Sequence, residues 1–195
     1  MLNVASRVVV GGVLWLLALP SLAQQGAPPL PKPGPEHEVL KQDVGTWDAV
    51  VEMLEPGKPP VVSKGTETVS LMTGGLWTMT DFKSTIMNAP FQGHGQNGFD
   101  PSKKKYVTSW VDSMSPGIIL GEYNYDAKTK TMKGAMEGPD MTGKVVKMTQ
   151  TTEWKDADTR VFTMFMPAVM AVPIAIGFEV SLAIVDVRMT AFCAD

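Results

Sequence analysis

Cysteine and histidine are almost absent from this chain of 195 residues, which has one Cys and two His. A single cysteine excludes an internal disulfide and any metal site built from several thiolates. Two histidines are too few for a metal site or proton relay that needs several imidazoles. Charge is sparse as well, because 20 acidic and 17 basic residues make up only 19% of the chain and give a net charge of -3. This balance argues against nucleic-acid binding, and we expect no nucleic-acid partner.

The N-terminus has the pattern of a secretory signal peptide over residues 1–23. Arg7 is positive, residues 8–19 are an apolar run too short for an ordinary membrane span, and Pro20 follows that run. Ser21 and Ala23 place small side chains at the positions that precede cleavage, before Gln24. We therefore expect export to the periplasm or out of the cell, with membrane contact only through the signal peptide during export. The alternative is an uncleaved N-terminal anchor.

The rest of the chain, up to residue 166, has the closely spaced turn sequences typical of an all-β protein. Residues 24–35 form a proline-rich leader, and residues 36–43 predict a short helix whose Val39 and Leu40, with Val44 after them, can plug the end of a barrel. From Gly45 onward, β-prone runs alternate with Pro, Gly and Asp turn sequences. The expected strands are residues 45–53, 61–71, 75–83, 90–99, 104–112, 117–125, 129–137, 143–154 and 159–166. Because closure removes exposed edges, residues 36–166 predict an antiparallel up-and-down β-barrel domain.

Alternation along the strands assigns side chains to two faces. The residues that share a face are Tyr106, Thr108, Trp110 and Asp112 in one strand and Gly121, Tyr123 and Tyr125 in the next. Neither face of most strands is purely apolar. This favours a barrel with a partly polar lumen over a sandwich with one dry core.

A short helix followed by Gly45-Thr46-Trp47 resembles the G-x-W motif with which lipocalin-like barrels begin. Gly45 lets the chain turn into the first strand, and Trp47 is placed to close the barrel against the helix. A longer pattern resembles the DUF1579 family, bacterial proteins of unknown function that are often secreted. That pattern consists of residues 36–37 (EH), 45–47 (GTW), 55–60 (EPGKPP), 64–66 (KGT), 90–93 (PFQG), 98–100 (GFD), 103–107 (KKKYV), 109–115 (SWVDSMS) and 139–144 (PDMTGK). The resemblance covers about residues 36–166 and implies a calycin-like β-barrel, but no reaction, since none is established for the family.

The resemblance ends at Pro167, and residues 167–195 form a divergent apolar tail. Two interpretations stay open. Residues 167–173 (PAVMAVP), back-translated and shifted by two bases with G at the free positions, read Gly-Gly-Asp-Gly-Gly-Thr, a good hairpin turn, which points to a frameshift near codon 167. The other interpretation is an irregular last strand, for which the β-branched residues 178–187 are suited.

Four residues are candidates for lining a ligand site: Trp77, His94, Trp110 and Tyr125. His94 lies between two glycines, which let a ligand or another backbone come close, although a lone histidine is more often a surface or turn residue. Tryptophans spread over several strands either fill a barrel core or line a pocket for a flat apolar ligand.

Methionine is abundant, with 14 residues. Met164 and Met166 share one strand face, as do Met132 and Met136, and thioethers are soft ligands suited to Cu(I). No histidine reinforces these pairs, so we interpret them as adaptable lining of a core or pocket. We expect no metal and no cofactor.

No catalytic constellation is visible in the sequence. The strand residues Asp81, Asp112, Glu122 and Glu153 show no Glu-x-x-His or Asp-x-Asp spacing, and no serine lies in a G-x-S-x-G motif. We therefore expect a secreted or periplasmic β-barrel that binds a small apolar or amphipathic molecule in its lumen, rather than an enzyme. Two alternatives stay open: a lipocalin-like enzyme acting on such a molecule, and a structural or interaction module with a filled core. The oligomeric state is left open.

Overall fold

A computed structural model describes residues 29–54, 59–86, 88–167 and the strand at 184–193. The expected signal peptide, most of the leader and residues 168–183 of the tail therefore lie outside the described residues. The second of the chain's two units, Lys32–Asp195, holds every helix and strand that the structure describes. Within this described part, no helix is long and apolar enough to cross a membrane.

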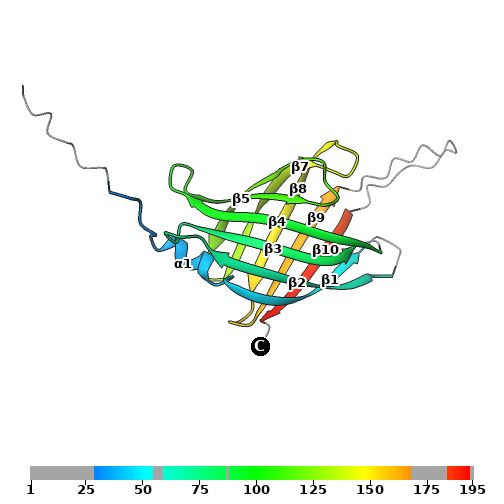
Figure 1. Ribbon diagram of the computed structural model, residues 1–195, viewed down its shortest axis with the longest axis horizontal. Coiled ribbons are helices and arrows are strands. Elements are labelled where there is room, and N and C mark those ends of the chain that lie inside the picture. Colours follow the sequence, from blue (N-terminus) through cyan, green and yellow to red (C-terminus); the bar gives the residue numbers. More distant parts are fainter. Residues whose placement is uncertain (1–28, 55–58, 87, 168–183, 194–195) are drawn as a thin grey trace, which may run out of the picture. The chain divides into compact units, whose positions relative to one another are not determined.

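Ten antiparallel strands and one short helix make up this unit (Figure 1). They are α1 (Glu36–Lys41), β1 (Gly45–Leu54), β2 (Val61–Leu71), β3 (Trp77–Ile86), β4 (Ala89–Asp100), β5 (Lys105–Asp112), β6 (Ile119–Asp126), β7 (Thr131–Pro139), β8 (Val145–Trp154), β9 (Thr159–Pro167) and β10 (Ile184–Cys193). The predicted all-β, up-and-down architecture is confirmed, and β1 to β9 follow the expected strands within a few residues. Local turn chemistry therefore fixes most of the strand boundaries.

The sheet closes on itself because β1 pairs with β2 on one side and with β10 on the other. In Figure 1, β10 (red) lies between β1 and β9, in agreement with its register to both strands. The closing strand Ile184–Cys193 overlaps the predicted strand 178–187 at residues 184–187 and continues to Cys193, while residues 178–183 lie outside the described residues. Its position is set by pairing with β1 and β9, which are distant in sequence, and not by its own β-branched content.

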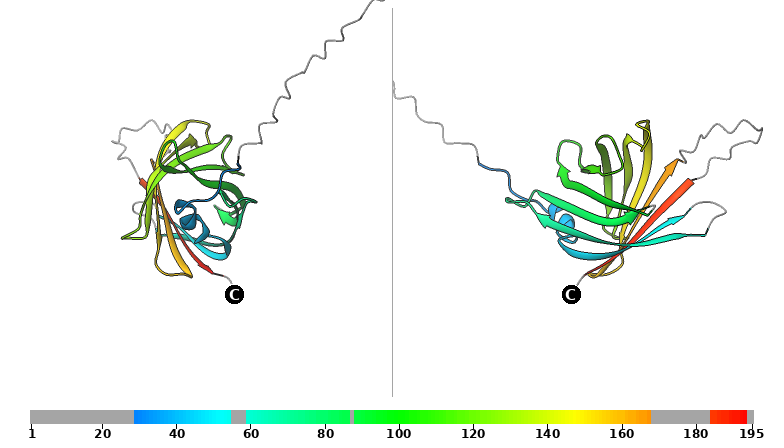
Figure 2. Two further views of the ribbon diagram at one scale, coloured as in Figure 1. Left: turned by 90° about the vertical axis from the view of Figure 1, so that its left-hand side faces the viewer. Right: turned by 45° about the vertical axis from the view of Figure 1, so that its right-hand side comes forward.

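One end of the barrel is occupied by α1, as predicted (Figure 2, left). Leu40 is buried there, and Val39 packs against the same core cluster. The chain enters β1 through Gly45, whose φ of 149° is a conformation that residues with a side chain rarely adopt. The opposite end, where β3 meets β4 and β5 meets β6, has no helix among the described residues and is called the open end below.

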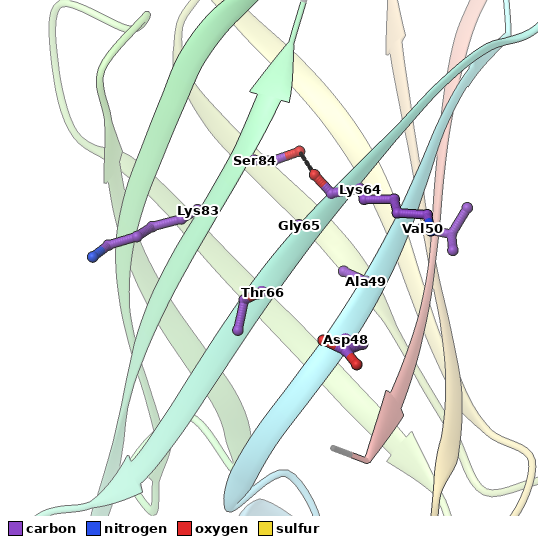
Figure 3. Close-up of a pocket in the computed structure, with 8 residues that line it drawn as sticks. All are labelled: Asp48, Ala49, Val50, Lys64, Gly65, Thr66, Lys83 and Ser84. Atoms are coloured by element: carbon purple, nitrogen blue, oxygen red, sulfur yellow. Dashed lines mark hydrogen bonds between the residues drawn. The ribbon is translucent and has the colours of Figure 1, made fainter. Parts of the chain in front are cut away.

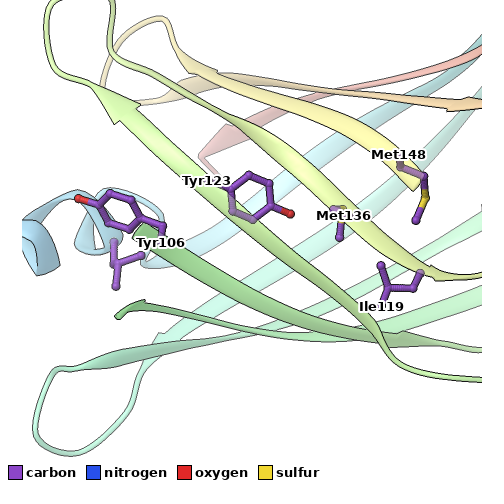
Figure 4. Packing of buried hydrophobic residues seen from close by; sticks show 6 residues of the cluster. Tyr106, Ile119, Tyr123, Met136 and Met148 are labelled. Carbon is purple, nitrogen blue, oxygen red and sulfur yellow. The ribbon is translucent and has the colours of Figure 1, made fainter. Parts of the chain in front are cut away.

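Strict alternation divides the strands into an inner and an outer face. In β3, for example, Thr78, Thr80 and Phe82 are buried, whereas Asp81 and Lys83 are exposed. The inner faces form three clusters of buried side chains, the largest of which joins Leu40 to strands β5 to β8 (Figure 4). The core is therefore formed by the side chains that line the barrel.

Candidate functional site

Trp47 seals the end of the barrel where α1 sits. Its side chain is 2% exposed, and its indole Nε1 donates a hydrogen bond to the backbone oxygen of Asp43 over 2.8 Å. The guanidinium carbon of Arg160, at the start of β9, lies 4.7 Å from the centroid of the indole ring. The tryptophan of the Gly45-Thr46-Trp47 motif is thus buried next to Val69, with a cation stacked on it.

Arg160 is itself held by two carboxylates. Its Nη1 lies 2.7 Å from Asp43 Oδ1, and its Nη2 donates to Glu67 Oε2 on β2. Trp154 Nε1 also donates to Asp43 Oδ1, over 2.9 Å. Burial raises the pKa of Glu67 above its usual range, and the nearby Arg160 only partly opposes this. Burial alone would lower the pKa of Arg160, but Asp43 and Glu67 outweigh it and raise that pKa.

A chain of edge-to-face aromatic rings forms a floor above α1. It runs from His37 through Phe99, Tyr106 and Tyr125 to Trp154, with successive ring centroids 5.3 to 6.4 Å apart. The Tyr106 hydroxyl donates to the backbone oxygen of Glu36 and so ties this floor to the helix. Burial, followed by the charge of Glu36, raises the pKa of Tyr106 to about 12. At this end Tyr106 and Trp154 are therefore buried, and a hydrogen bond links the aromatic rings to α1.

Higher in the barrel, inward-facing side chains remain partly accessible. The half-buried residues that point inward include Phe91, Trp110, Val146, Gln150, Phe162, Met164 and Met166. Met136 and Met148, directly paired on β7 and β8, lie two residues farther from the α1 end than Gly134 and Gln150, and both are buried (Figure 4). Half-buried aromatic, thioether and amide side chains thus alternate with fully buried ones along the inner face of the described strands.

Two of the four predicted ligand residues face this interior. Trp110 on β5 packs against two of the core clusters, and its Nε1 donates to Asp112 Oδ2 over 3.0 Å. Its ring lies over Gly93, where an added Cβ would come within 2.1 Å of it. Tyr125 is half-buried and belongs to the aromatic floor. Both remain candidates for ligand contact.

The other two lie on the outer face. Trp77 is 37% exposed and covers Gly98, its partner on β4, from outside. His94 points outward, with Nδ1 against the carboxylate of Asp81 and Nε2 3.1 Å from Gln92 Nε2. The structure therefore does not bring Trp77 and His94 together with Trp110 and Tyr125. The space beside the glycines that flank His94 is taken by the Trp110 ring, on the opposite side of the sheet.

Two open hollows are bordered by residues of the strands. The larger, of about 630 Å³, lies across β1, β2 and β3 (Figure 3), and its charged lining residues Asp48, Lys64 and Lys83 are exposed. The smaller, of about 140 Å³, is bordered by Met79, His94 and Ile118. Neither has the enclosed apolar lining that a small apolar ligand needs.

Titratable side chains in the described residues do not assemble into a catalytic group. Asp81 and Glu122 face outward on different strands, and Asp112 faces inward near the open end. Lys103 and Lys105 flank Glu122 and lower its pKa to about 2, as expected for an exposed ion pair. No group of three or more His, Cys, Asp or Glu that could hold a metal ion occurs within the described ranges.

Sequence reasoning missed Arg160, Glu67 and Gln150. Arg160 and Glu67 are 93 positions apart, so nothing local signals their contact. Gln150 faces the lumen from the middle of β8, where it accepts a hydrogen bond from the Tyr123 hydroxyl over 2.9 Å. Its position in the β8 alternation was the one available signal.

Comparison with known proteins identifies a family and a fold. The family model "Protein of unknown function (DUF1579)" matches residues 32–170. No curated protein matches. An S-type phycobiliprotein lyase, CPES from Guillardia theta, superposes with a TM-score of 0.55 and 6% identity, covering 82% of this chain and 93% of the lyase chain. A structure described as EF1p2_mFAP2b bound to DFHBI covers 81% of this chain and 98% of its own, with 11% identity and a TM-score of 0.42. The likeness to the lyase shows a shared fold.

Proposed function

We propose that this chain, which belongs to the DUF1579 family of proteins of unknown function, binds a small apolar or amphipathic molecule inside its barrel. One observation carries the proposal: several inward-facing aromatic and thioether side chains, among them Trp110, Met164 and Met166, stay half-buried. A core that served only for stability would bury these groups, because each exposed apolar side chain forfeits about 1.5–3 kcal/mol of burial free energy.

The dimensions of the fold support the same proposal. Barrel diameter grows with strand number, and a barrel of about eight strands is just wide enough to hold side chains or one small ligand. Ten strands give a wider interior. Wall residues such as Met164 and Met166 on β9 are adaptable, since methionine fits irregular apolar shapes.

The place of action is part of the proposal. Residues 1–23 have the pattern of a signal peptide, so we propose that the barrel works after export, in the periplasm or outside the cell. In that compartment an apolar molecule needs a carrier to cross water, and a barrel with apolar side chains inside would provide one.

A fluorescent titration with Nile red, an uncharged apolar dye, tests the proposal. Ser84 on β3 points inward opposite Phe91, whereas its neighbour Thr85 is exposed on the outer face. Ser84→Trp should fill the lumen and weaken dye binding at least about tenfold, while Thr85→Trp should leave it unchanged. Both variants must first show wild-type circular dichroism. Equal binding by the two variants, or no binding by the wild type, would contradict the proposed function and favour a module with a filled core.

A further inference from the structure

One hydrogen-bonded polar group interrupts the apolar wall of the lumen. The Tyr123 hydroxyl donates to Gln150 Oε1 over 2.9 Å, and Gln150 Nε2 lies 3.4 Å from Thr152 Oγ1 on the same strand. Tyr123 and Thr152 are buried, and Gln150 is half-buried. Gln150 is therefore the member of this group that a molecule in the lumen can reach.

The backbone around Gln150 is shaped to allow this contact. Gly134 on β7 is paired with Tyr123 on one side and with Gln150 on the other. A Cβ at Gly134 would come within 2.6 Å of the Tyr123 ring, so only a glycine lets that ring lie across β7 and reach β8. Met164 faces Gln150 from β9. The amide is thus held by a phenol at one end and surrounded by apolar side chains.

Counting donors shows what the amide can still bind. A glutamine Nε2 carries two N–H groups, whereas Oε1 accepts only. The Tyr123 hydroxyl takes one of the two lone pairs of Oε1, and the long contact to Thr152 uses at most one N–H. A second N–H is therefore left for an acceptor atom in the lumen.

The charges of the described interior restrict that acceptor further. Arg160 is the inward-facing cation of the described strands, and Asp43 and Glu67 already bind its guanidinium. Asp112, the inward-facing acid near the open end, already accepts hydrogen bonds from Trp110, the Met114 backbone and Ser115. An anionic head group would therefore enter an acidic interior without a free cation. The desolvation penalty of such an unpaired ion is several kcal/mol.

We propose that the lumen selects a neutral amphiphile, with an apolar body and an uncharged carbonyl that accepts the free N–H of Gln150. This inference rests on the proposed function and names the ligand class of the same site. It separates this barrel from carriers of fatty-acid anions, which need a cation for the carboxylate. The carbonyl oxygen takes the place of water on the amide, and the apolar body lies against the aromatic and methionine wall.

Displacement of bound Nile red by three ligands of equal chain length provides the test. The ligands are decanamide, decanoate at about pH 8, where the carboxyl is ionised, and decylammonium. Decanamide should displace the dye at a concentration at least about tenfold lower than either ion, since one unpaired charge outweighs one hydrogen bond. Decanoate or decylammonium that displaces the dye as well as decanamide does, while Nile red still binds, would overturn the inference and leave the proposed function standing. Failure of Nile red and all three ligands to bind would overturn both.

A matched pair of variants assigns the effect to Gln150. Gln150→Met keeps the length of the side chain and removes the amide, so the preference for decanamide over decanoate should fall about fivefold. Thr151→Met changes the outward-facing neighbour and should leave that preference intact. An unchanged preference in folded Gln150→Met would refute the role of the amide. Nile red affinity, read in the same experiment, confirms that the lumen of each variant is still open to ligand.

Discussion

Replacing Arg160 with methionine removes the cation that holds the closed end of the barrel together. The Arg160 side chain is 7% exposed, and its two carboxylate partners, Asp43 and Glu67, are 19% and 10% exposed. Arg160→Met leaves both acids without their cation and also removes the cation stacked on Trp47. Loss of one member of a buried ion pair costs about 3–5 kcal/mol, and the stacking adds about 0.5–2 kcal/mol. We therefore expect a loss of at least about 3 kcal/mol in the free energy of unfolding.

Urea unfolding at neutral pH, followed by tryptophan fluorescence, measures this loss directly. Trp47 and Trp154 both touch the Arg160–Asp43–Glu67 cluster and so report on it. The double variant Arg160→Met/Glu67→Leu should recover part of the stability, because it removes the more buried of the two unpaired acids and leaves only Asp43 without its cation. Lys105→Met, which breaks an exposed pair with Glu122, is the control and should cost less than about 1 kcal/mol. A loss from Arg160→Met as small as the control's would refute the view that the cluster is buried and coupled.

Three further predictions follow from the same geometry. Trp47→Ala should cost about 3–5 kcal/mol in urea unfolding, and a loss below about 1 kcal/mol would show that the indole does not seal the barrel. Because the pKa of Tyr106 is raised to about 12 in the folded state, its stabilisation should be complete below about pH 10 and lost as the pH rises toward the raised value; Tyr106→Phe should flatten that alkaline loss, measured as unfolding free energy against pH. His94→Ala should leave Nile red affinity within about twofold of wild type, since the ring points outward, and a tenfold loss would contradict that placement.

Strand boundaries were predictable because each turn is determined by the few residues that form it. The Asp100–Pro101 turn lies between β4 and β5, and the Asp126-Ala127-Lys128 loop lies between β6 and β7. Both contain residues that favour turns. The closing strand overlaps the predicted residues 178–187 at 184–187 and continues to Cys193, because Ile184–Cys193 is positioned by pairing with β1 and β9 across the barrel. Non-local pairing of this kind leaves no signal within the strand itself.

The facing of the candidate residues was partly readable in advance. Gly93 and Gly95 point inward beneath the Trp110 ring, so strict alternation puts His94 between them on the outer face. Glycines beside a histidine therefore indicated a close approach of another group, as expected, but on the opposite side of the sheet. Arg160 and Glu67 were invisible for a different reason: a buried ion pair between distant strands depends on barrel register, which the chain encodes only as a whole.

Native mass spectrometry of the purified protein tests most directly whether the barrel carries a molecule in its lumen. We expect a peak heavier than the chain alone, and collisional activation should release the extra mass as one small neutral molecule. The heavier peak should be lost in Ser84→Trp and kept in Thr85→Trp. A wild-type protein that has only the mass of its own chain, and that stays so after incubation with decanamide and Nile red, would contradict the account.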